Sequence, residues 1–364
     1  MNEKLKVLIS GGGTGGHIYP AIAVAQAIEK KLNGNVEFLF VGASDRMEME
    51  KVPKAGYKIE GLWISGFQRS LSFKNLMFPF KVISAVLKSR GIIGRFKPEL
   101  AIGFGGYASG ASMWAAGSKS IPVLIHEQNS FAGITNKILK SKASKICVAY
   151  DNMDRFFPAD KIIKTGNPVR ADICDPSDKR SKAFSFFKLD SNKKTVLIIG
   201  GSLGARTINQ ALNAGWEQLV NAGYNVIWQK GNNFPSADGL QHQNLVVRNF
   251  IYEMDLAYAA ADVVISRAGA LSIAELAIVK KPVILVPSPN VSEDHQTKNA
   301  MALVDKNAAI LVKDADAAQS LINETLALLN DVSLQSKLQN EISHFAIHNA
   351  AELIANEALA LIGK

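Results

Sequence analysis

Residues 6–17, with the sequence KVLISGGGTGGH, decide the fold of the first part of the chain. The first five of these residues are mostly apolar, which is typical of a buried parallel strand. Gly11, Gly13 and Gly16 then match the pattern G-x-G-x-x-G, in which backbone N–H groups approach a diphosphate at the start of a helix. The same glycines also suit a tight turn without a ligand, so the loop alone leaves both explanations open.

A segment of helical period over 21–31 follows this loop, and we expect Pro20 in its opening turn. In the dinucleotide-binding form of the motif, an acidic residue closes the second strand about 20 positions further on. The second apolar run, 36–41, is instead followed by Gly42 and Ala43. The missing acid counts against NAD as the ligand and against a dehydrogenase.

Apolar runs alternate with segments of helical period through most of the chain. This alternation predicts the α/β fold class, with a doubly wound sheet of parallel strands in each half. The expected strands are 6–10, 36–41, 100–104 and 122–126 in the first half, and 195–199, 225–229, 245–249, 262–266 and 282–286 in the second. Further helices are expected near 315–330, 333–345 and 349–362.

The chain has 364 residues, which is too long for one ordinary core and suits two domains. A Gly-Asn-Pro sequence at 166–168 interrupts the pattern, so we place the boundary there. We expect one Rossmann-like domain over 1–166, completed by a C-terminal helix within 346–364, and a second over 167–345. Each half opens with a strand, a glycine-rich loop and a helix, which indicates a duplicated architecture.

The composition is that of a packed globular protein, with 48% hydrophobic and 20% charged residues. We find no signal peptide and no run of about 18 apolar residues, so we expect a protein kept in the cytoplasm. The two cysteines, Cys147 and Cys174, lack metal-binding spacing and suit a reducing compartment. The net charge of +9 leaves nucleic acid, anionic membranes and phosphate-bearing ligands open.

Two further glycine-rich loops follow expected strands, at 103–107 (GFGGY) and 200–205 (GGSLGA). Ligands of open α/β sheets bind in the crevice outside the carboxyl ends of the strands, where such loops gather. Three glycine-rich strand ends therefore indicate several phosphates, or one long diphosphate ligand, rather than tight turns alone.

Two ionisable residues near these loops each have a chemical and a structural explanation. His17 ends the first loop and can take a proton from an attacking hydroxyl near neutral pH, or form only a local hydrogen bond. Glu275 lies in the segment 266–275 (SRAGALSIAE), where a Gly-Ala pair leaves a helix start open to phosphate. Its carboxylate can accept hydrogen bonds from two ribose hydroxyls, or act as a capping acid three residues after Ser272.

Six motifs stand in the order and spacing of one family: GGGTGGH (11–17), HEQN (126–129), GNPVR (166–170), GGSLGA (200–205), SRAGALSIAE (266–275) and DHQTKNA (294–300). Together they resemble the MurG family, the GT-B glycosyltransferases of family 28, over nearly the whole chain. The resemblance implies two Rossmann-like domains that face each other across a deep cleft. It also implies an inverting N-acetylglucosaminyltransferase that uses UDP-N-acetylglucosamine (UDP-GlcNAc). The acceptor implied is the C4 hydroxyl of the N-acetylmuramyl (MurNAc) pentapeptide of lipid I, which becomes lipid II for peptidoglycan synthesis.

The resemblance assigns donor contacts mainly to the second domain. Ser202 is expected at the diphosphate, Ile251 at the uracil and Gln296 at the transferred sugar. Glu275 is expected at the ribose hydroxyls. The positions that match UDP-GlcNAc contacts are Thr14, Gly15, Gly16, Asn129, Arg170, Ser202, Ile251, Ala270, Leu271, Ser272, Ile273, Ala274, Glu275 and Gln296.

The resemblance assigns the acceptor and the catalytic groups to the first domain. His17, as a base or an acceptor-orienting group, and Asn129 match catalytic positions. The positions that match acceptor-diphosphate loops are Gly13, Gly105, Gly106 and Tyr107. Inverting transfer needs a base for the acceptor hydroxyl and stabilisation of charge on the departing UDP. Helix dipoles and N–H groups can supply the second. We identify no Asp-x-Asp motif and no cluster of His, Cys and Asp with ligand spacing, so we expect no cofactor and no obligatory metal.

The stretch 61–98 contains no acidic residue, and aromatic residues and leucines interleave there with lysines and arginines. Such a mixture suits a surface that dips into anionic lipid, or a core helix with solvated lysines. The family is peripheral at the membrane, which favours the first explanation and implies the cytoplasmic face of the bacterial inner membrane. The expected membrane face is Phe73, Lys74, Leu76, Phe78, Phe80 and Lys81. The partners implied are UDP-GlcNAc, lipid I, anionic lipids and cell-wall or division proteins, without nucleic acid.

Two other classes of function stay open from the sequence. Another GT-B enzyme on a UDP-sugar, such as a glycolipid synthase or an epimerase, would differ in its acceptor. Incubation with UDP-GlcNAc and a lipid I analogue separates that enzyme from the first hypothesis. A non-catalytic module for a nucleotide-sugar or a membrane would bind without releasing UDP.

Overall fold

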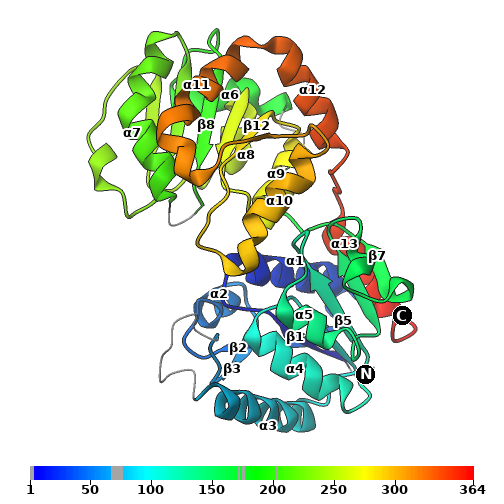
Figure 1. Cartoon of the computed structure of the whole chain (residues 1–364). Helices are drawn as coiled ribbons and strands as arrows, with labels where there is room; N and C mark the ends of the chain where they lie inside the picture. The colour runs from blue at the N-terminus through cyan, green and yellow to red at the C-terminus, as the bar shows by residue number, and fades with distance from the viewer. Residues whose placement is uncertain (1–3, 67–76, 171–172, 174–176, 202–203) are drawn as a thin grey trace. The chain divides into compact units, whose positions relative to one another are not determined.

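The computed structural model describes residues 4–364 except 67–76, 171–172, 174–176 and 202–203 (Figure 1). The chain divides into two compact units. Unit 1 is Met1–Val169 with Asn349–Lys364, and unit 2 is Arg170–His348. Among the described residues, no helix combines the length and the hydropathy needed to cross a membrane.

The described part of unit 1 is built on a sheet of seven parallel strands, in the order β3-β2-β1-β4-β5-β6-β7. The strands are β1 (Leu5–Ser10), β2 (Val36–Ala43), β3 (Lys58–Leu62), β4 (Leu100–Gly103), β5 (Val123–Glu127), β6 (Lys145–Val148) and β7 (Ile162–Lys164). The helices are α1 (Gly15–Lys31), α2 (Glu48–Lys54), α3 (Phe78–Phe96), α4 (Tyr107–Gly117), α5 (Ile134–Leu139) and α13 (Ala350–Ala360).

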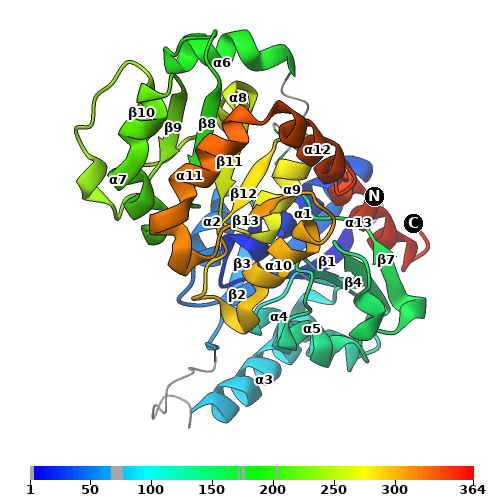
Figure 2. The ribbon, with the colours of Figure 1, turned by 45° about the horizontal axis from the view of Figure 1, so that its top comes forward.

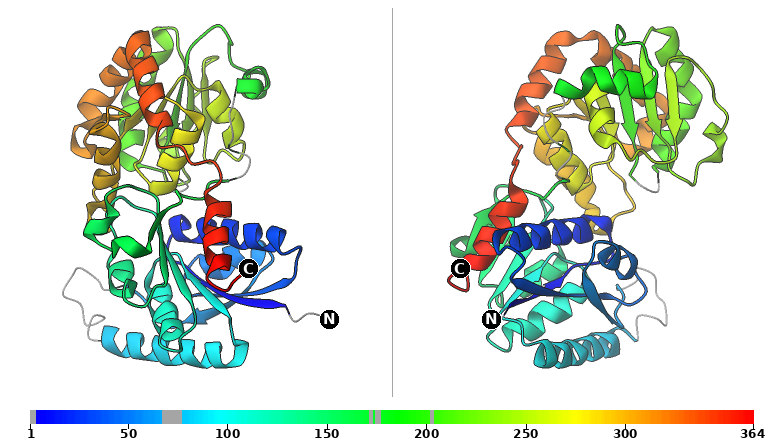
Figure 3. Two further views of the ribbon diagram at one scale, coloured as in Figure 1. Left: turned by 90° about the vertical axis from the view of Figure 1, so that its right-hand side faces the viewer. Right: turned by 180° about the vertical axis from the view of Figure 1, so that it is seen from behind.

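Strand β1 sends apolar side chains to both faces of this sheet, because successive residues of a strand point to opposite sides. Leu8 joins the core under α3, α4 and α5, whereas Val7 and Ile9 join the core under α1 and α13. Figure 3 shows α13, in red, beside α1 on that second face. Ile354 and Leu359 of α13 are buried there, and each such burial contributes about 1.5–3 kcal/mol. The core of unit 1 is therefore complete only when α13 is in place.

The described part of unit 2 repeats this arrangement with a sheet of six parallel strands, in the order β10-β9-β8-β11-β12-β13. The strands are β8 (Thr195–Ile199), β9 (Asn225–Gln229), β10 (Leu245–Arg248), β11 (Val263–Ser266), β12 (Val283–Leu285) and β13 (Ile310–Leu311). The helices are α6 (Arg180–Phe187), α7 (Arg206–Asn221), α8 (Met254–Ala260), α9 (Ala270–Val279), α10 (His295–Val304), α11 (Ala317–Asn330) and α12 (Val332–Ser343).

The sheet of unit 2 is also covered on both faces. Val196 and Ile198 of β8 belong to the core under α7 and α11, whose packing is visible in Figure 2. Leu197, between them, points to the opposite face and is buried as well. The strand order in both units is that of the doubly wound nucleotide-binding fold. The predicted α/β class and the duplicated architecture are therefore confirmed.

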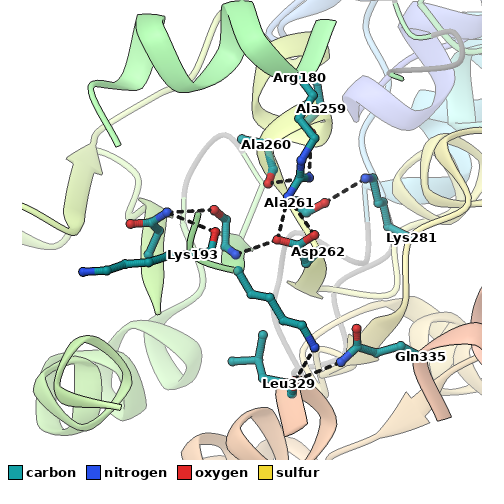
Figure 4. Close-up of polar contacts among 12 residues, drawn as sticks. Arg180, Lys193, Ala259, Ala260, Ala261, Asp262, Lys281, Leu329 and Gln335 are labelled. Atoms are coloured by element: carbon teal, nitrogen blue, oxygen red, sulfur yellow. Dashed lines mark hydrogen bonds and ion pairs between the residues drawn. The ribbon is translucent and has the colours of Figure 1, made fainter. Parts of the chain in front are cut away.

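A polar network closes the amino ends of the strands in unit 2, opposite the edge that carries the glycine-rich loops (Figure 4). Asp262, just before β11, accepts hydrogen bonds from Arg180 at 3.0 and 3.1 Å and from the backbone N–H of Thr195 at 2.7 Å. Arg180 also donates to the carbonyl oxygens of Ala259 and Ala260. The network anchors α6 and the end of α8 to the starts of β8 and β11.

The chain leaves unit 1 after Val169, slightly later than the boundary expected after residue 166. The residues around this boundary are tied into unit 1 by hydrogen bonds. Nε2 of His126 donates to the carbonyl oxygen of Gly166 at 2.9 Å, and Nδ2 of Asn167 donates to that of Gln128 at 3.0 Å. The Gly-Asn-Pro sequence therefore follows β7 and still belongs to unit 1.

The predicted strands and the three predicted closing helices are confirmed, and the structure adds the short strands β3, β6, β7 and β13. The prediction that Pro20 lies in the opening turn of the first helix is wrong, because α1 begins at Gly15. The carbonyl oxygen of Thr14 accepts the backbone N–H groups of His17 and Ile18. These bonds start the helix inside the glycine-rich loop.

Candidate functional site

The strand order reverses at two points, between β1 and β4 in unit 1 and between β8 and β11 in unit 2. Ligands of such sheets bind outside the carboxyl ends of the strands at this point. The loops 11–14 and 104–106 follow β1 and β4, and the loops 200–205 and 267–269 follow β8 and β11. Each unit therefore presents a pair of loops at its ligand-binding edge.

A buried carboxylate that was not predicted sets the shape of the first loop. Glu48, at the start of α2, is 0% exposed and accepts the backbone N–H groups of Gly13 and Ala43, each at 3.0 Å. A Cβ atom on Gly12 would lie 2.1 Å from Oε1 of Glu48, and one on Gly42 would lie 2.5 Å from its Cγ. Glu48 therefore requires two glycines outside the G-x-G-x-x-G pattern. It also occupies the N–H of Gly13, a residue predicted to face the acceptor diphosphate.

The second loop of unit 1 packs directly against the first. Gly106 has a φ of +86°, and a Cβ atom there would lie 2.5 Å from the carbonyl oxygen of Gly12. Gly105 has a φ of +91°. L-residues rarely adopt this region, and no side chain fits between the two backbones, so the contact depends on glycine.

His17 lies where these two loops meet. Its Nδ1 is 2.8 Å from the carbonyl oxygen of Gly12, so Nδ1 carries the proton of the neutral ring. The lone pair is then on Nε2, which would lie 3.1 Å from a Cβ atom built on Gly105. This tautomer suits a base that acts through Nε2, next to the loop that leads to the exposed Tyr107.

The HEQN sequence ends β5, and its buried side chains join neighbouring strand ends. Nδ1 of His126 accepts a hydrogen bond from Nε2 of Gln128 at 3.1 Å, and Nε2 of His126 donates to Gly166. Gln128 also donates to the carbonyl oxygen of Phe104, just after β4, at 3.0 Å. Burial lowers the pKa of His126 to about 4, so its ring stays neutral near neutral pH and supports the loops instead.

Glu127 fixes the loop that carries Asn129. Its Oε1 accepts the backbone N–H of Asn129 at 3.1 Å and the side-chain Nδ2 of Asn129 at 3.3 Å. Its Oε2 accepts the N–H of Gly133 at 3.0 Å and Nδ2 of Asn136 at 2.8 Å. Asn129 is therefore held at the same edge of the sheet as His17, which suits its predicted role.

Three helix N-termini at these edges carry no acidic residue in the first turn. The first turns of α1, α4 and α9, all within the described residues, contain no acidic side chain. Their N-cap residues Thr14, Gly106 and Gly269 make no side-chain capping hydrogen bond. The dipole of each helix is therefore directed at the loop that precedes it, which contains at least one glycine, and favours phosphate there. The predicted donor contacts 270–274 form the opening of α9.

A buried glutamine joins two of the predicted donor loops in unit 2. Gln229, at the end of β9, donates through Nε2 to the carbonyl oxygen of Gly201 at 3.1 Å. Its Oε1 accepts the backbone N–H of Ile251 at 2.9 Å. The side chain of Ile251 is buried, and the aromatic rings of Phe250 and Tyr252 on either side of it are exposed. A uracil base at this position would therefore meet the backbone of Ile251 and these neighbouring rings.

Glu275 of α9 is paired with a buried tyrosine of α8. The hydroxyl of Tyr258 donates to Oε2 of Glu275 at 3.0 Å. Burial and then the charge of Glu275 raise the pKa of Tyr258 well above its usual value, and the charge of Arg170 acts in the opposite direction. The helix begins after Gly269, so Ser272 is not its N-cap and the capping explanation for Glu275 is wrong.

Both units match one protein family along most of their length. Residues 7–148 match the Glycosyltransferase family 28 N-terminal domain, and residues 195–356 match the Glycosyltransferase family 28 C-terminal domain. The chain belongs to glycosyltransferase family 28.

Curated relatives carry one common description, UDP-N-acetylglucosamine--N-acetylmuramyl-(pentapeptide) pyrophosphoryl-undecaprenol N-acetylglucosamine transferase. The relative from Cytophaga hutchinsonii is 53% identical and is matched over 98% of this chain and 97% of its own length. The relative from Flavobacterium psychrophilum is 51% identical over 99% of this chain and 98% of its own length.

Solved structures agree with the family 28 assignment. The crystal structure of Acinetobacter baumannii MurG is 29% identical, with a TM-score of 0.79, and the match covers 98% of this chain and 99% of that one. A UDP-GlcNAc 2-epimerase from Neisseria meningitidis shares the fold at 17% identity, with a TM-score of 0.68 over 98% of this chain and 100% of that one. The predicted GT-B fold is confirmed, and the deep cleft between its domains stays a prediction.

The family 28 C-terminal domain also holds its α9 loop through an arginine. Arg267 forms an ion pair with Asp314 and donates to Thr207 at 2.8 Å and to the carbonyl oxygen of Val286 at 2.9 Å. The expectation of no obligatory metal assumed that the sequence has no Asp-x-Asp motif. That premise is wrong, because Asp314, Ala315 and Asp316 form one; the carboxylate of Asp314 is engaged by Arg267. Among the described residues, no group of three or more His, Cys, Asp or Glu side chains is placed to hold a metal ion.

Helix α10 places the predicted sugar contact near the start of α9. Oε1 of Gln296 accepts the backbone N–H of Ser288 at 2.9 Å, which ties α10 to the loop after β12. Nδ2 of Asn299 donates to the carbonyl oxygen of Ala268 at 3.3 Å, which ties α10 to the loop before α9. Ser202, the predicted diphosphate contact, lies outside the described residues.

Helix α3 carries an exposed apolar face in the stretch without acidic residues. Phe80, Ile83 and Leu87 are 64%, 58% and 61% exposed, and their spacing puts them on one side of the helix. The opposite side of α3 packs in the core of unit 1. The core-helix explanation therefore holds for one side only.

Two of the predicted membrane-face residues make contacts within unit 1. Phe78 packs against Tyr107 at 6.2 Å between ring centroids, and Lys81 donates to Ser65 at 2.8 Å. Phe73, Lys74 and Leu76 were also predicted for the membrane face, but they lie outside the described residues.

Proposed function

We propose that this protein transfers GlcNAc from UDP-GlcNAc to the C4 hydroxyl of the MurNAc-pentapeptide in lipid I and so forms lipid II. The observation that carries the proposal is the 53% identity, over 98% of the chain, to a transferase named for this reaction. The site supports it, because each unit presents helix N-termini and glycine-rich loops at its switch point. A diphosphate-linked donor and a diphosphate-linked acceptor need two such edges.

In this proposal unit 2 holds the donor. The N-terminus of α9, whose first turn has no acidic residue, faces the diphosphate, and its dipole stabilises the charge that develops on the departing UDP. Glu275 accepts hydrogen bonds from the ribose hydroxyls, and Arg170 adds positive charge nearby. The segment around Ile251 meets the uracil, and Gln296 contacts the transferred sugar.

Unit 1 holds and activates the acceptor. The C4 oxygen attacks the anomeric carbon of GlcNAc, and the bond from that carbon to the β-phosphate oxygen breaks. The hydroxyl proton passes to Nε2 of His17, and the electron pair of the broken bond leaves with UDP. Attack on the face opposite UDP inverts the anomeric centre and gives the β-1,4 bond. The loop 105–107 orients the acceptor, and Asn129 contacts the donor sugar nucleotide.

The test is incubation of the purified protein with UDP-GlcNAc and a lipid I analogue, followed by mass spectrometry of the lipid and measurement of UDP. We expect the disaccharide lipid and equimolar UDP, also in the presence of EDTA, since N–H groups stabilise the diphosphate. His17→Ala should lower turnover and leave UDP affinity nearly unchanged, while the exposed His344→Ala should change neither. An epimerised UDP-sugar without lipid product, or UDP binding without turnover, would overturn the proposal.

We also propose that the exposed face of α3 rests on anionic lipid at the cytoplasmic face of the inner membrane. Phe80, Ile83 and Leu87 supply an apolar surface, and the surrounding stretch supplies only positive charge. We expect sedimentation with phosphatidylglycerol vesicles, and its loss in the double variant Phe80→Ser, Leu87→Ser. Val332→Ser, which removes an equally exposed apolar side chain from unit 2, is the control. Equal sedimentation of both variants would refute the assignment; contacts with cell-wall or division proteins stay a prediction.

A further inference from the structure

We propose that Tyr258 is a positioning residue that holds the Glu275 carboxylate in place for the ribose of a uridine diphosphate. This inference rests on the proposed role of Glu275 at the ribose. It adds a residue that does not contact the ligand itself but determines how tightly the Glu275 carboxylate binds the ribose.

The first support is geometric. Tyr258 lies on α8 and Glu275 on α9, and the hydroxyl of Tyr258 donates to Oε2 of Glu275 at 3.0 Å. In the chain, α8 directly precedes β11 and α9 directly follows it. The bond between their side chains therefore ties the Glu275 carboxylate, on the second turn of α9, to a neighbouring helix.

The second support is the burial of the tyrosine. Tyr258 is 0% exposed and is among the largest fully buried side chains described. A buried tyrosine hydroxyl needs a hydrogen-bond partner. A backbone carbonyl would satisfy it, but here the partner is a carboxylate, and hydrogen bonds to ionised groups are the stronger kind. Burial raises the pKa of Tyr258, so the hydroxyl stays protonated and can donate near neutral pH.

The third support is the charge around the hydroxyl. Arg170 and Glu275 both act electrostatically on Tyr258, although they stand far apart in the sequence. The tyrosine therefore lies among groups that this protein is proposed to use for the donor, rather than in a purely apolar part of the core. A carboxylate that is already oriented loses less conformational freedom when it binds two hydroxyls, so the bond should increase affinity for the ribose.

Calorimetry with UDP, 2′-deoxy-UDP and 3′-deoxy-UDP tests this role. The wild-type protein should bind UDP more tightly than at least one deoxy analogue, by about 10-fold or more for a hydrogen bond to a charged group. Tyr258→Phe keeps the ring and removes only the hydroxyl. We expect it to weaken UDP by about 10-fold while the deoxy analogue loses much less, so the discrimination between the two ligands shrinks. Tyr224→Phe, which removes an exposed hydroxyl bonded to Asn330 in the same unit, should leave the ratio unchanged.

The outcomes separate this inference from the proposed function. No UDP binding to the folded wild type would overturn the proposed function. Equal binding of UDP and both deoxy analogues would leave that function standing but overturn the ribose role of Glu275, and with it this inference. Normal discrimination in the wild type with the same ratio in Tyr258→Phe would overturn the positioning role. If Tyr258→Phe does not fold, Glu275→Asp tests the bond from the other side, because a shorter carboxylate cannot reach both the tyrosine and the ribose. An unchanged ratio in that variant would equally overturn the inference.

Discussion

Replacement of Glu48 by glutamine should loosen the first glycine-rich loop without changing the size of the side chain. Both carboxylate oxygens of Glu48 accept backbone N–H groups, from Gly13 and Ala43, at 3.0 Å each. A carboxamide offers one oxygen and turns its NH₂ group toward the other N–H. The variant therefore loses one hydrogen bond to a charged acceptor and leaves a buried donor unpaired, which costs about 1.5–3 kcal/mol.

This cost falls on the loop that supports His17, because Gly12 lies between the Glu48 carboxylate and the Nδ1 of the histidine. We expect Glu48→Gln to lower the free energy of unfolding of unit 1 by about 2 kcal/mol in urea titrations. Turnover with a lipid I analogue should fall at least 10-fold, while calorimetry should show unchanged UDP affinity. Glu50→Gln, at an exposed position of the same helix, is the matched control and should behave as the wild type. Wild-type stability and turnover in Glu48→Gln would refute the role of the carboxylate.

Two further substitutions test buried elements of unit 1. Burial holds the pKa of His126 at about 4, below the value of about 6.5 in an unfolded chain. The unfolded chain therefore binds a proton at this histidine more readily than the folded protein does. The free energy of unfolding falls as the pH is lowered from above 6.5 toward 4, by about 2 kcal/mol between pH 7 and pH 5. Urea unfolding of His126→Gln should show that much less pH dependence, and an unchanged slope would contradict the assignment. In Gly106→Ala, the new Cβ atom would lie 2.5 Å from the carbonyl oxygen of Gly12, at a residue whose φ is +86°. The melting temperature and the turnover of this variant should therefore both fall clearly. Gly223→Ala, with a φ of +91° but open space around its Cβ, should cost only the backbone strain and keep full turnover.

The strands that could be predicted are those whose residues are almost all apolar. Strand β8 reads TVLII and is buried at every position, so its sequence and its place agree. Strand β3 reads KIEGL and is only partly buried, and β13 has two residues. Neither sequence is more apolar than the residues around it, so neither could be recognised as a strand. These strands form because a neighbouring strand already offers hydrogen bonds, which is a tertiary effect.

The site could be predicted where the backbone conformation requires a particular residue type. Glycine is required at positive φ and in close backbone contacts, and such glycines located the loops after β1, β4 and β8. Glu48, Gln229 and Tyr258 could not be found in this way, because their partners are backbone atoms or residues far along the chain. A signal existed for Glu48 only, since Gly12 and Gly42 exceed what the phosphate-binding pattern needs.

The return of α13 to unit 1 has a consequence for biosynthesis. A ribosome delivers Met1–Val169 first, but Ile354 and Leu359, which cover part of that sheet, are translated only after the whole of unit 2. Unit 2 can therefore finish folding first, whereas unit 1 keeps apolar strand residues uncovered until α13 leaves the ribosome. The unit that is translated first is thus the one that completes its core second.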